Sequence, residues 1–152
     1  MAALLHDVGK IAVPDAILTK TEKLTDEEFD IIKEHPVTGE RMLVGLPYLS
    51  KDILPAVRHH HERWDGRGYP DGLAGGAVPP DAAIMAVADS FDAMTSTRTY
   101  RRALTSKEAV RRIREGSGTQ FAPHVVVAFE RAFAAGDLLI ADSEAPTSSR
   151  TA

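Results

Sequence analysis

Cysteine is absent from this 152-residue sequence. The chain therefore has no disulfide, no thiolate ligand for zinc and no cysteine nucleophile, and any metal would have to be held by His, Asp or Glu. Long apolar runs are absent too, since none approaches the roughly 18 residues of a membrane-spanning helix. The first five residues also lack the basic start and the length of a signal peptide. We therefore expect a cytoplasmic protein with no membrane segment.

Net positive charge is also lacking: the formal charge is −4, so there is no overall electrostatic attraction to DNA and we expect no DNA partner. A local excess of arginine nevertheless occurs at Arg98, Arg101, Arg102, Arg111, Arg112 and Arg114. These side chains could contact a phosphate-bearing ligand or could form a solvated helix face. For the last three, the solvated face is the favoured interpretation. An apolar fraction of 43% and a charged fraction of 26% are typical of a globular chain with one core.

Local signals predict an all-α fold. Thr25 and Glu28 form a capping box, which predicts a helix that begins near Asp26. Residues 2–7 have the composition of the last turns of a helix that begins upstream. Further helices are expected over 36–43, from about 51 into the histidines at 59–61, and over 81–96, 106–115 and 123–135. Nothing alternates with the period of a strand.

Two segments are predicted to be irregular. Residues 65–80 contain five glycines and three prolines, which is the composition of a loop. Ordered loops of this length are usually functional or mobile. Residues 141–152 are rich in Ser, Thr, Ala and Pro, and we expect a disordered tail there.

The pair His6-Asp7 is a candidate metal site. Lys10 follows four residues after His6 and three after Asp7, so all three side chains could share one helix face. The imidazole could bind one metal while the carboxylate bridges two, an arrangement that generates hydroxide near neutral pH. A single His-Asp pair is common, so these residues alone leave a structural role open.

Three consecutive histidines, His59 to His61, precede Glu62. Neighbouring helical side chains point about 100° apart, so two could flank a metal centre while the third turns away. Asp89 lies in an apolar helical stretch where an unpaired carboxylate would be costly, so it needs a metal or a buried arginine. The candidate ligands form an imidazole and carboxylate set suited to iron, manganese or zinc: His6, Asp7, His35, His60, His61 and Asp89.

Four stretches, in this order and spacing, resemble HD-GYP domains, a branch of the HD phosphohydrolases. These stretches are His6-Asp7-Val8-Gly9-Lys10, His35-Pro36 with Gly39, His60-His61-Glu62-Arg63-Trp64-Asp65-Gly66-Arg67-Gly68-Tyr69-Pro70, and Ala88-Asp89 through Arg98. The resemblance covers roughly residues 2 to 135 and implies one HD-GYP domain over residues 1–140, an all-α helical bundle.

The resemblance implies a phosphodiesterase that hydrolyses cyclic di-GMP to linear pGpG, or to GMP, in bacterial signalling. It implies two or three divalent metal ions, most often iron or manganese with zinc as an alternative, held by the six candidate ligands. Lys10 and Asp7 match catalytic positions, and Lys10, Tyr69, Pro70, Arg98 and Arg101 match substrate-binding positions. It further implies docking of a diguanylate cyclase (GGDEF) domain to the Gly-Tyr-Pro loop, and a homodimer.

The sequence departs from the family pattern in three places. HD-GYP domains carry helices and a histidine ligand ahead of the His-Asp pair, whereas five residues precede His6 here. We therefore expect a bundle without its first helices and an incomplete metal site. Ala122 replaces an aspartate before the last helix, and Thr99 replaces a proline. Two alternatives stay open: a catalytically silent module that binds cyclic di-GMP or a cyclase domain, and a hydrolase of another cyclic dinucleotide.

Overall fold

The computed structural model describes residues 1–49, 53–97 and 102–138, and the described chain is helical. Its elements in order are α1 (Ala2–Leu5), the 3₁₀ helix η1 (Val8–Ala12), α2 (Asp15–Leu18), α3 (Asp26–Lys33), α4 (His35–Leu43), α5 (Ile53–His59), the 3₁₀ helix η2 (Gly75–Ala77), α6 (Pro80–Thr95), α7 (Ser106–Glu115) and α8 (Pro123–Ala135). In these ranges β pairing is limited to two isolated bridges. The all-α prediction is confirmed.

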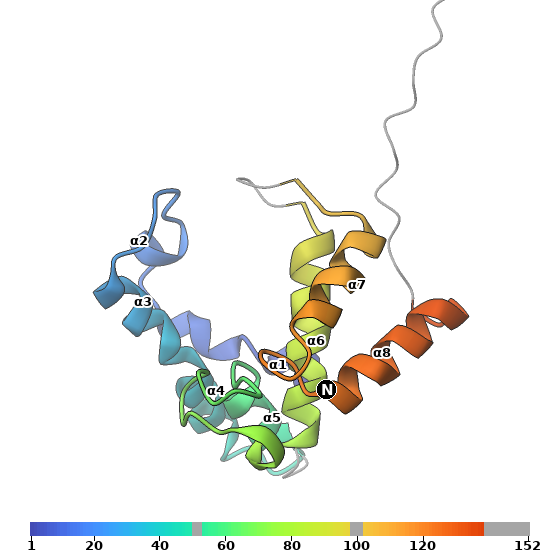
Figure 1. Cartoon of the computed structure of the whole chain (residues 1–152). Coiled ribbons are helices and arrows are strands. Elements are labelled where there is room, and N and C mark those ends of the chain that lie inside the picture. Colours follow the sequence, from blue (N-terminus) through green and yellow to red (C-terminus); the bar gives the residue numbers. More distant parts are fainter. Residues whose placement is uncertain (50–52, 98–101, 139–152) are drawn as a thin grey trace, which may run out of the picture.

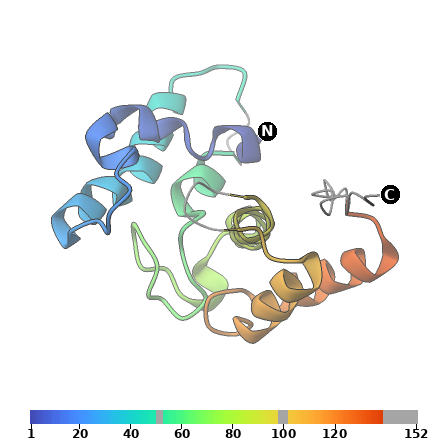
Figure 2. The same cartoon turned by 90° about the horizontal axis from the view of Figure 1, so that it is seen from above.

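The longest helix, α6, lies at the centre of the molecule (Figure 1). It packs against α5 on one side and against α7 and α8 on the other, and α4 packs against η1 and α5. Figure 2 shows α6 end-on between the N-terminal helices and the α7–α8 pair. None of the helices in the described part of the chain combines the length and the apolar character needed to span a bilayer.

The helix starts follow the local signals. Thr25 Oγ1 accepts a hydrogen bond from Glu28 N at 3.2 Å, and the Glu28 carboxylate accepts one from Thr25 N at 2.8 Å, so the predicted capping box is confirmed. The helix α8 begins at Pro123 as predicted, and Ala122 at its N-cap offers no side-chain hydrogen bond. Such a missing cap costs about 1 kcal/mol.

The core lies where α6, α7 and α8 meet. Its buried members are Val78, Ala82, Ala83, Val87, Ile113, Phe121, Ala122, Val125 and Val126. Small residues on α6 let the neighbouring helices approach closely, and β-branched residues of α7 and α8 fill the space between them. The core therefore fixes α6, which carries Asp89, relative to the C-terminal helices.

The N-terminal helix is shorter than predicted. We expected helix over residues 2–7 with His6, Asp7 and Lys10 on one face, but α1 ends at Leu5 and Lys10 lies on η1. The reason is a close approach: a Cβ on Gly9 would lie 2.0 Å from the carbonyl oxygen of His35, so η1 packs directly on the backbone of α4. The short α2 was also not predicted.

The other predicted ranges agree within a few residues. The helix expected from about 51 is α5; residues 50–52 lie outside the described chain, and His60 and His61 follow its end. Residues 65–79 are irregular as predicted, apart from η2 and a bridge between Asp65 and Ala74. The predicted tail at 141–152 lies outside the described residues.

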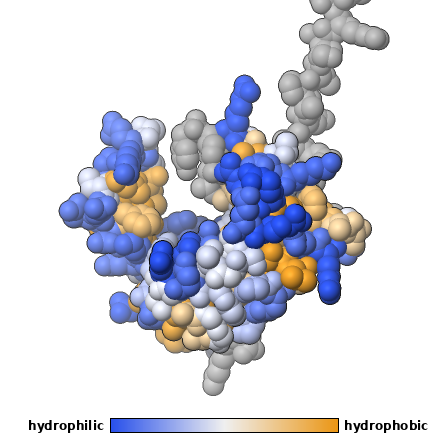
Figure 3. All heavy atoms as spheres, viewed as in Figure 1, coloured by the Kyte–Doolittle hydropathy of each residue, from blue (hydrophilic) through white to orange (hydrophobic). Residues whose placement is uncertain are grey.

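The arginines of α7 form a solvated face, which confirms the favoured interpretation. Arg111 pairs with Glu108 and Glu115, Arg112 pairs with Glu108, and Arg114 pairs with Glu130. All three side chains are at least half exposed. The surface over α7 is accordingly hydrophilic in Figure 3.

Replacement of Gly9 by alanine tests the packing of η1 on α4. The new Cβ would meet backbone atoms of His35 and Gly39, which cannot rotate away. We expect Gly9→Ala to lower the free energy of unfolding by about 3 kcal/mol, measured by urea denaturation. Gly45→Ala is the control, because a Cβ at that position would have no other atom within 4 Å; its effect should stay within about 0.5 kcal/mol. Equal effects at the two sites would contradict this account of η1.

Candidate metal centre

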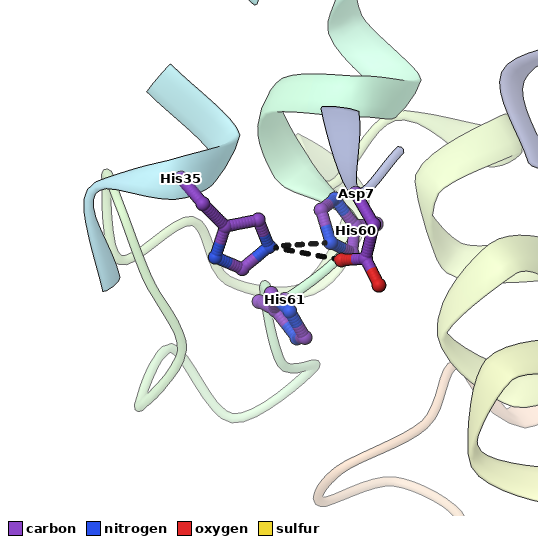
Figure 4. Close-up of side chains that lie close together, drawn as sticks. All are labelled: Asp7, His35, His60 and His61. Atoms are coloured by element: carbon purple, nitrogen blue, oxygen red, sulfur yellow. Dashed lines mark hydrogen bonds and ion pairs between the residues drawn. The ribbon is translucent and has the colours of Figure 1, made fainter. Parts of the chain in front are cut away.

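Four of the predicted ligands converge on one point. One ligand atom from each of Asp7, His35, His60 and His61 lies within 4.8 Å of the others. His35 Nε2 lies 3.3 Å from His60 Nε2 and 3.3 Å from Asp7 Oδ1 (Figure 4). The four side chains come from the α1–η1 junction, from the start of α4 and from the turn after α5.

Backbone carbonyls orient two of the imidazoles. His35 Nδ1 donates to Ile32 O and His60 Nδ1 donates to Val57 O, each at 2.7 Å. A carbonyl can only accept, so we assign the proton of each neutral ring to Nδ1. The two Nε2 atoms are then both acceptors, and they face each other at 3.3 Å. Such a pair needs a cation between or beside it.

Asp7 adds a third acceptor. Its Oδ2 accepts a hydrogen bond from Lys10 Nζ at 2.7 Å. Its Oδ1 is the only buried side-chain polar atom of the described residues that has no hydrogen bond. Burial acts to raise the pKa of Asp7, but the hydrogen bond from Lys10 and its positive charge act to lower it, and the pKa lies well below its usual range. The carboxylate is therefore charged and available.

His60 and His61 are held neutral. Burial, followed by the repulsion of neighbouring imidazoles, lowers the pKa of His60 to about 4 and that of His61 to about 3. Neutral imidazole is the form that binds a metal, so no proton has to be displaced at neutral pH. These residues fit the divalent metal that the donor chemistry implies.

The spacing also fits. Ligand atoms on a single ion lie at most about 4.2 Å apart when the bonds are about 2.1 Å long. The four atoms here fall within 4.8 Å, so they could bind one ion after a shift of a few tenths of an ångström or share two ions.

The remaining predicted ligands lie beside this set. His6 Nε2 is 3.6 Å from Asp7 Oδ2 and 3.8 Å from Asp89 Oδ1, so it connects the cluster to α6. The expectation that Asp89 occupies an apolar environment is wrong, because its side chain is 41% exposed. The neighbouring face of α6, with Ala88 and Asp92, is exposed as well.

The Gly-Tyr-Pro loop reaches the cluster through Tyr69. The phenol ring stacks on His61 with 4.7 Å between centroids, and the peptide bond to Pro70 is cis. Burial, with the charges of Asp7 and Asp89, raises the pKa of Tyr69, so the phenol stays protonated. Arg98 and Arg101, the other predicted substrate contacts, lie outside the described residues.

His59 is the histidine that turns away from the cluster. Its Nε2 lies 2.9 Å from Asp71, and the same carboxylate pairs with Arg58 at 2.7 Å. This contact confirms the expectation that one histidine of the three points elsewhere.

Two supporting residues were not predicted. Glu62 is buried, and its two carboxylate oxygens accept the backbone N–H groups of Asp71 and Leu73 at 2.7 and 3.0 Å. Asp71 in turn is held by Arg58 and His59. In the sequence, the only signs of these roles are the positions of Glu62 directly after the histidines and of Asp71 directly after Pro70. Their partners could not be predicted, because they depend on how the loop folds back.

The fold and the site define a helical protein with a cluster of His and Asp side chains, able to hold a metal ion, at the junction of α1, α4 and α5. The chain belongs to the HD domain family, whose model matches residues 1–125.

Two relatives and one solved structure place it further. The chain is 47% identical over 132 residues to the cyclic di-GMP phosphodiesterase PA4108 of Pseudomonas aeruginosa, covering 87% of this chain and 32% of that protein. It is 49% identical over 130 residues to the cyclic di-GMP phosphodiesterase of Thermotoga maritima, covering 84% and 35%. The fold matches Bd1817, an HDG"Y"P protein from Bdellovibrio bacteriovorus, with a TM-score of 0.65 at 19% identity, covering 88% and 42%. The resemblance to HD-GYP domains is confirmed; the chain spans about a third of the length of these relatives.

Metal binding should depend on His60. We expect calorimetric titration with Mn²⁺ to show binding that His60→Gln weakens by at least about tenfold, because an amide oxygen is a poorer donor than Nε2 at this position. The matched control is His124→Gln, since His124 is exposed on α8 and, in the described part of the chain, its ring meets Trp64 edge to face, away from the cluster. Unchanged affinity in His60→Gln would contradict the proposed ligand set.

The stability of the metal-free protein should fall in mild acid. Folded His60 and His61 stay neutral down to about pH 4 and about pH 3, whereas the unfolded chain takes up protons below about pH 6.5. Their contribution is therefore fully present above pH 6.5 and is lost as the pH falls toward 4. Urea midpoints in EDTA should decrease between pH 6.5 and pH 5, above the range in which carboxylates titrate. His60→Gln should flatten this slope; an equal slope would contradict the assignment.

Proposed function

We propose that this chain is the catalytic domain of a metal-dependent phosphodiesterase that hydrolyses cyclic di-GMP to pGpG or GMP. The observation that carries the proposal is the convergence of three buried acceptors, the Nε2 atoms of His35 and His60 and Oδ1 of Asp7, with no donor among them. The names of the two relatives support the choice of substrate.

In this proposal Asp7, His35, His60 and His61 hold the metal, and His6 and Asp89 complete the ligand set at its edge. We infer two or three divalent ions, iron or manganese in preference to zinc. When bound, such ions supply Lewis-acid stabilisation of the phosphate and make water a stronger nucleophile near neutral pH.

Lys10 lies where a cation can assist the reaction. Its ammonium group is 2.7 Å from Asp7 Oδ2 and is partly exposed, so it can also contact a phosphate oxygen beside the cluster. During hydrolysis the oxygen of water joins phosphorus, the bond from phosphorus to the 3′ oxygen breaks, and that oxygen takes up a proton. Lys10 would stabilise the negative charge on the non-bridging oxygens.

The other inferred contacts surround this centre. Tyr69 and Pro70 would shape one wall of the substrate site, and Arg98 and Arg101 would bind phosphate or guanine from the chain after α6. We further propose a cytoplasmic location, docking of a GGDEF domain on the Gly-Tyr-Pro loop, and a homodimer.

Hydrolysis should depend on Lys10. With Mn²⁺ or Fe²⁺ and cyclic di-GMP, we expect release of pGpG or GMP, and we expect Lys10→Met to lower kcat by about 10²-fold. Lys107→Met is the control, because Lys107 is exposed on the first turn of α7 and is not part of the candidate site.

Chromatographic separation of the products checks the result. The absence of product from this chain, and also from a version extended to the length of its relatives, would contradict the proposal. Binding of the nucleotide without turnover in both would instead favour a catalytically silent module.

A further inference from the structure

A second pocket opens beside the candidate metal centre. It has a volume of about 380 Å³ and lies between α3 and the Gly-Tyr-Pro loop. Its wall includes Phe29, Lys33, His61, Arg63, Arg67 and Tyr69. His61 belongs to both the pocket and the four-residue cluster, so a ligand group in this pocket would be directly next to the metal site.

Two of the three cations in this pocket are already neutralised. Lys33 Nζ lies 2.6 Å from Asp30, and the Arg63 guanidinium lies 2.7 Å from Asp65. Arg67 differs from both, because no described residue forms a hydrogen bond or an ion pair with its guanidinium. Its backbone N donates to Asp65 Oδ1 at 3.1 Å. The loop therefore anchors the backbone of Arg67 and leaves its side chain available.

The same pocket offers an aromatic surface. Phe29 is 43% exposed although it is a large apolar side chain. Its ring meets Tyr69 edge to face, with 6.4 Å between the centroids, and Lys33 Nζ lies 4.9 Å from its centre. Tyr69 in turn stacks on His61, so the rings form a continuous path from the pocket to the cluster.

These features favour a nucleobase over a phosphate group as the occupant. A phosphate group would draw on several cations, and among the described residues of the pocket Arg67 is the cation without an ion pair, because Lys33 and Arg63 already pair with Asp30 and Asp65. A planar base can stack on an aromatic ring and accept two parallel hydrogen bonds from one arginine. Guanine presents O6 and N7 as two adjacent acceptors, whereas adenine presents N7 beside an amino donor. A guanidinium therefore favours guanine and disfavours adenine.

We propose that Arg67 selects guanine in this pocket by donating to O6 and N7 of one base of a cyclic dinucleotide, while Phe29 packs against the base. The inference rests on the proposed function, which supplies the cyclic dinucleotide as the ligand. The proposal gives Arg67 a role in substrate specificity. Arg67 is not among the residues assigned above to catalysis or to metal binding.

Equilibrium binding tests the assignment without turnover. Isothermal titration in EDTA compares cyclic di-GMP with cyclic di-AMP on the purified chain. We expect a preference for cyclic di-GMP of between about 5-fold and about 100-fold, which corresponds to one bidentate arginine–guanine pair. Arg67→Gln should remove the preference. Arg67→Lys should also remove it, while retaining more affinity for both nucleotides because it keeps the charge.

The matched control is Arg41→Gln, which removes an exposed arginine of α4 that lies outside the pocket. Its guanine preference should equal that of the unmodified chain. Circular dichroism checks that each variant is folded. A preference that survives in both Arg67 variants would overturn the assignment, as would an unmodified chain that binds neither nucleotide or binds both equally. Guanine preference without hydrolysis in the metal assay would instead reject the proposed function and leave the role of Arg67 standing.

Discussion

The hydrogen bonds from His35 and His60 to backbone carbonyls one turn earlier are the constraint on which the site depends. Each bond fixes the proton on Nδ1 and points the Nε2 lone pair at the same small volume. Helix α4, which carries His35, must also approach α5, whose end leads into His60. Gly39 permits this, because a Cβ there would lie 3.3 Å from Val57 Cγ1, and Gly9 permits the matching approach of η1 to α4. The geometry of the site therefore depends on both the glycines, which allow the close packing, and the histidines, whose rings are oriented by the backbone.

A second set of hydrogen bonds holds the Gly-Tyr-Pro loop against the histidine cluster. Glu62 binds the backbone N–H groups of Asp71 and Leu73 and so folds the loop back on the end of α5. Gly68 lies so close to this turn that an added Cβ would be 2.5 Å from Glu62 Cα. Tyr69, the next residue, is thereby kept on the ring of His61. The path of the loop is therefore fixed by the buried carboxylate of Glu62 and not by a helix or strand within the loop.

The parts of this structure that depend on local chemistry could be predicted from the sequence. The capping box at Thr25 and the proline at the start of α8 gave helix starts within one residue. The candidate metal ligands could be named from the sequence because several imidazoles and carboxylates in a set have few other uses, and four of the six converge in the structure. What failed depends on contacts between distant segments. The shortening of α1 follows from the approach of Gly9 to α4, and the exposure of Asp89 depends on what packs against α6.

In the proposed function, the charge balance of the cluster would suit an anionic diester. The two carboxylates of the proposed ligand set, Asp7 and Asp89, carry a charge of about −2, and imidazoles bind metal in their neutral form, so the set does not balance the charge of the two or three divalent ions inferred above. A carboxylate-rich site would neutralise its metal and repel a phosphate. Here the donor set would leave positive charge, and Lys10, held 2.7 Å from Asp7, adds to it on the exposed side. Since Asp7 is shared between Lys10 and the cluster, the same carboxylate that would bind the metal also positions the cation that faces the ligand. In the proposed function, affinity for phosphate would therefore arise from the ligand set itself, and the proposed role of Arg67 would leave the choice of base to the loop.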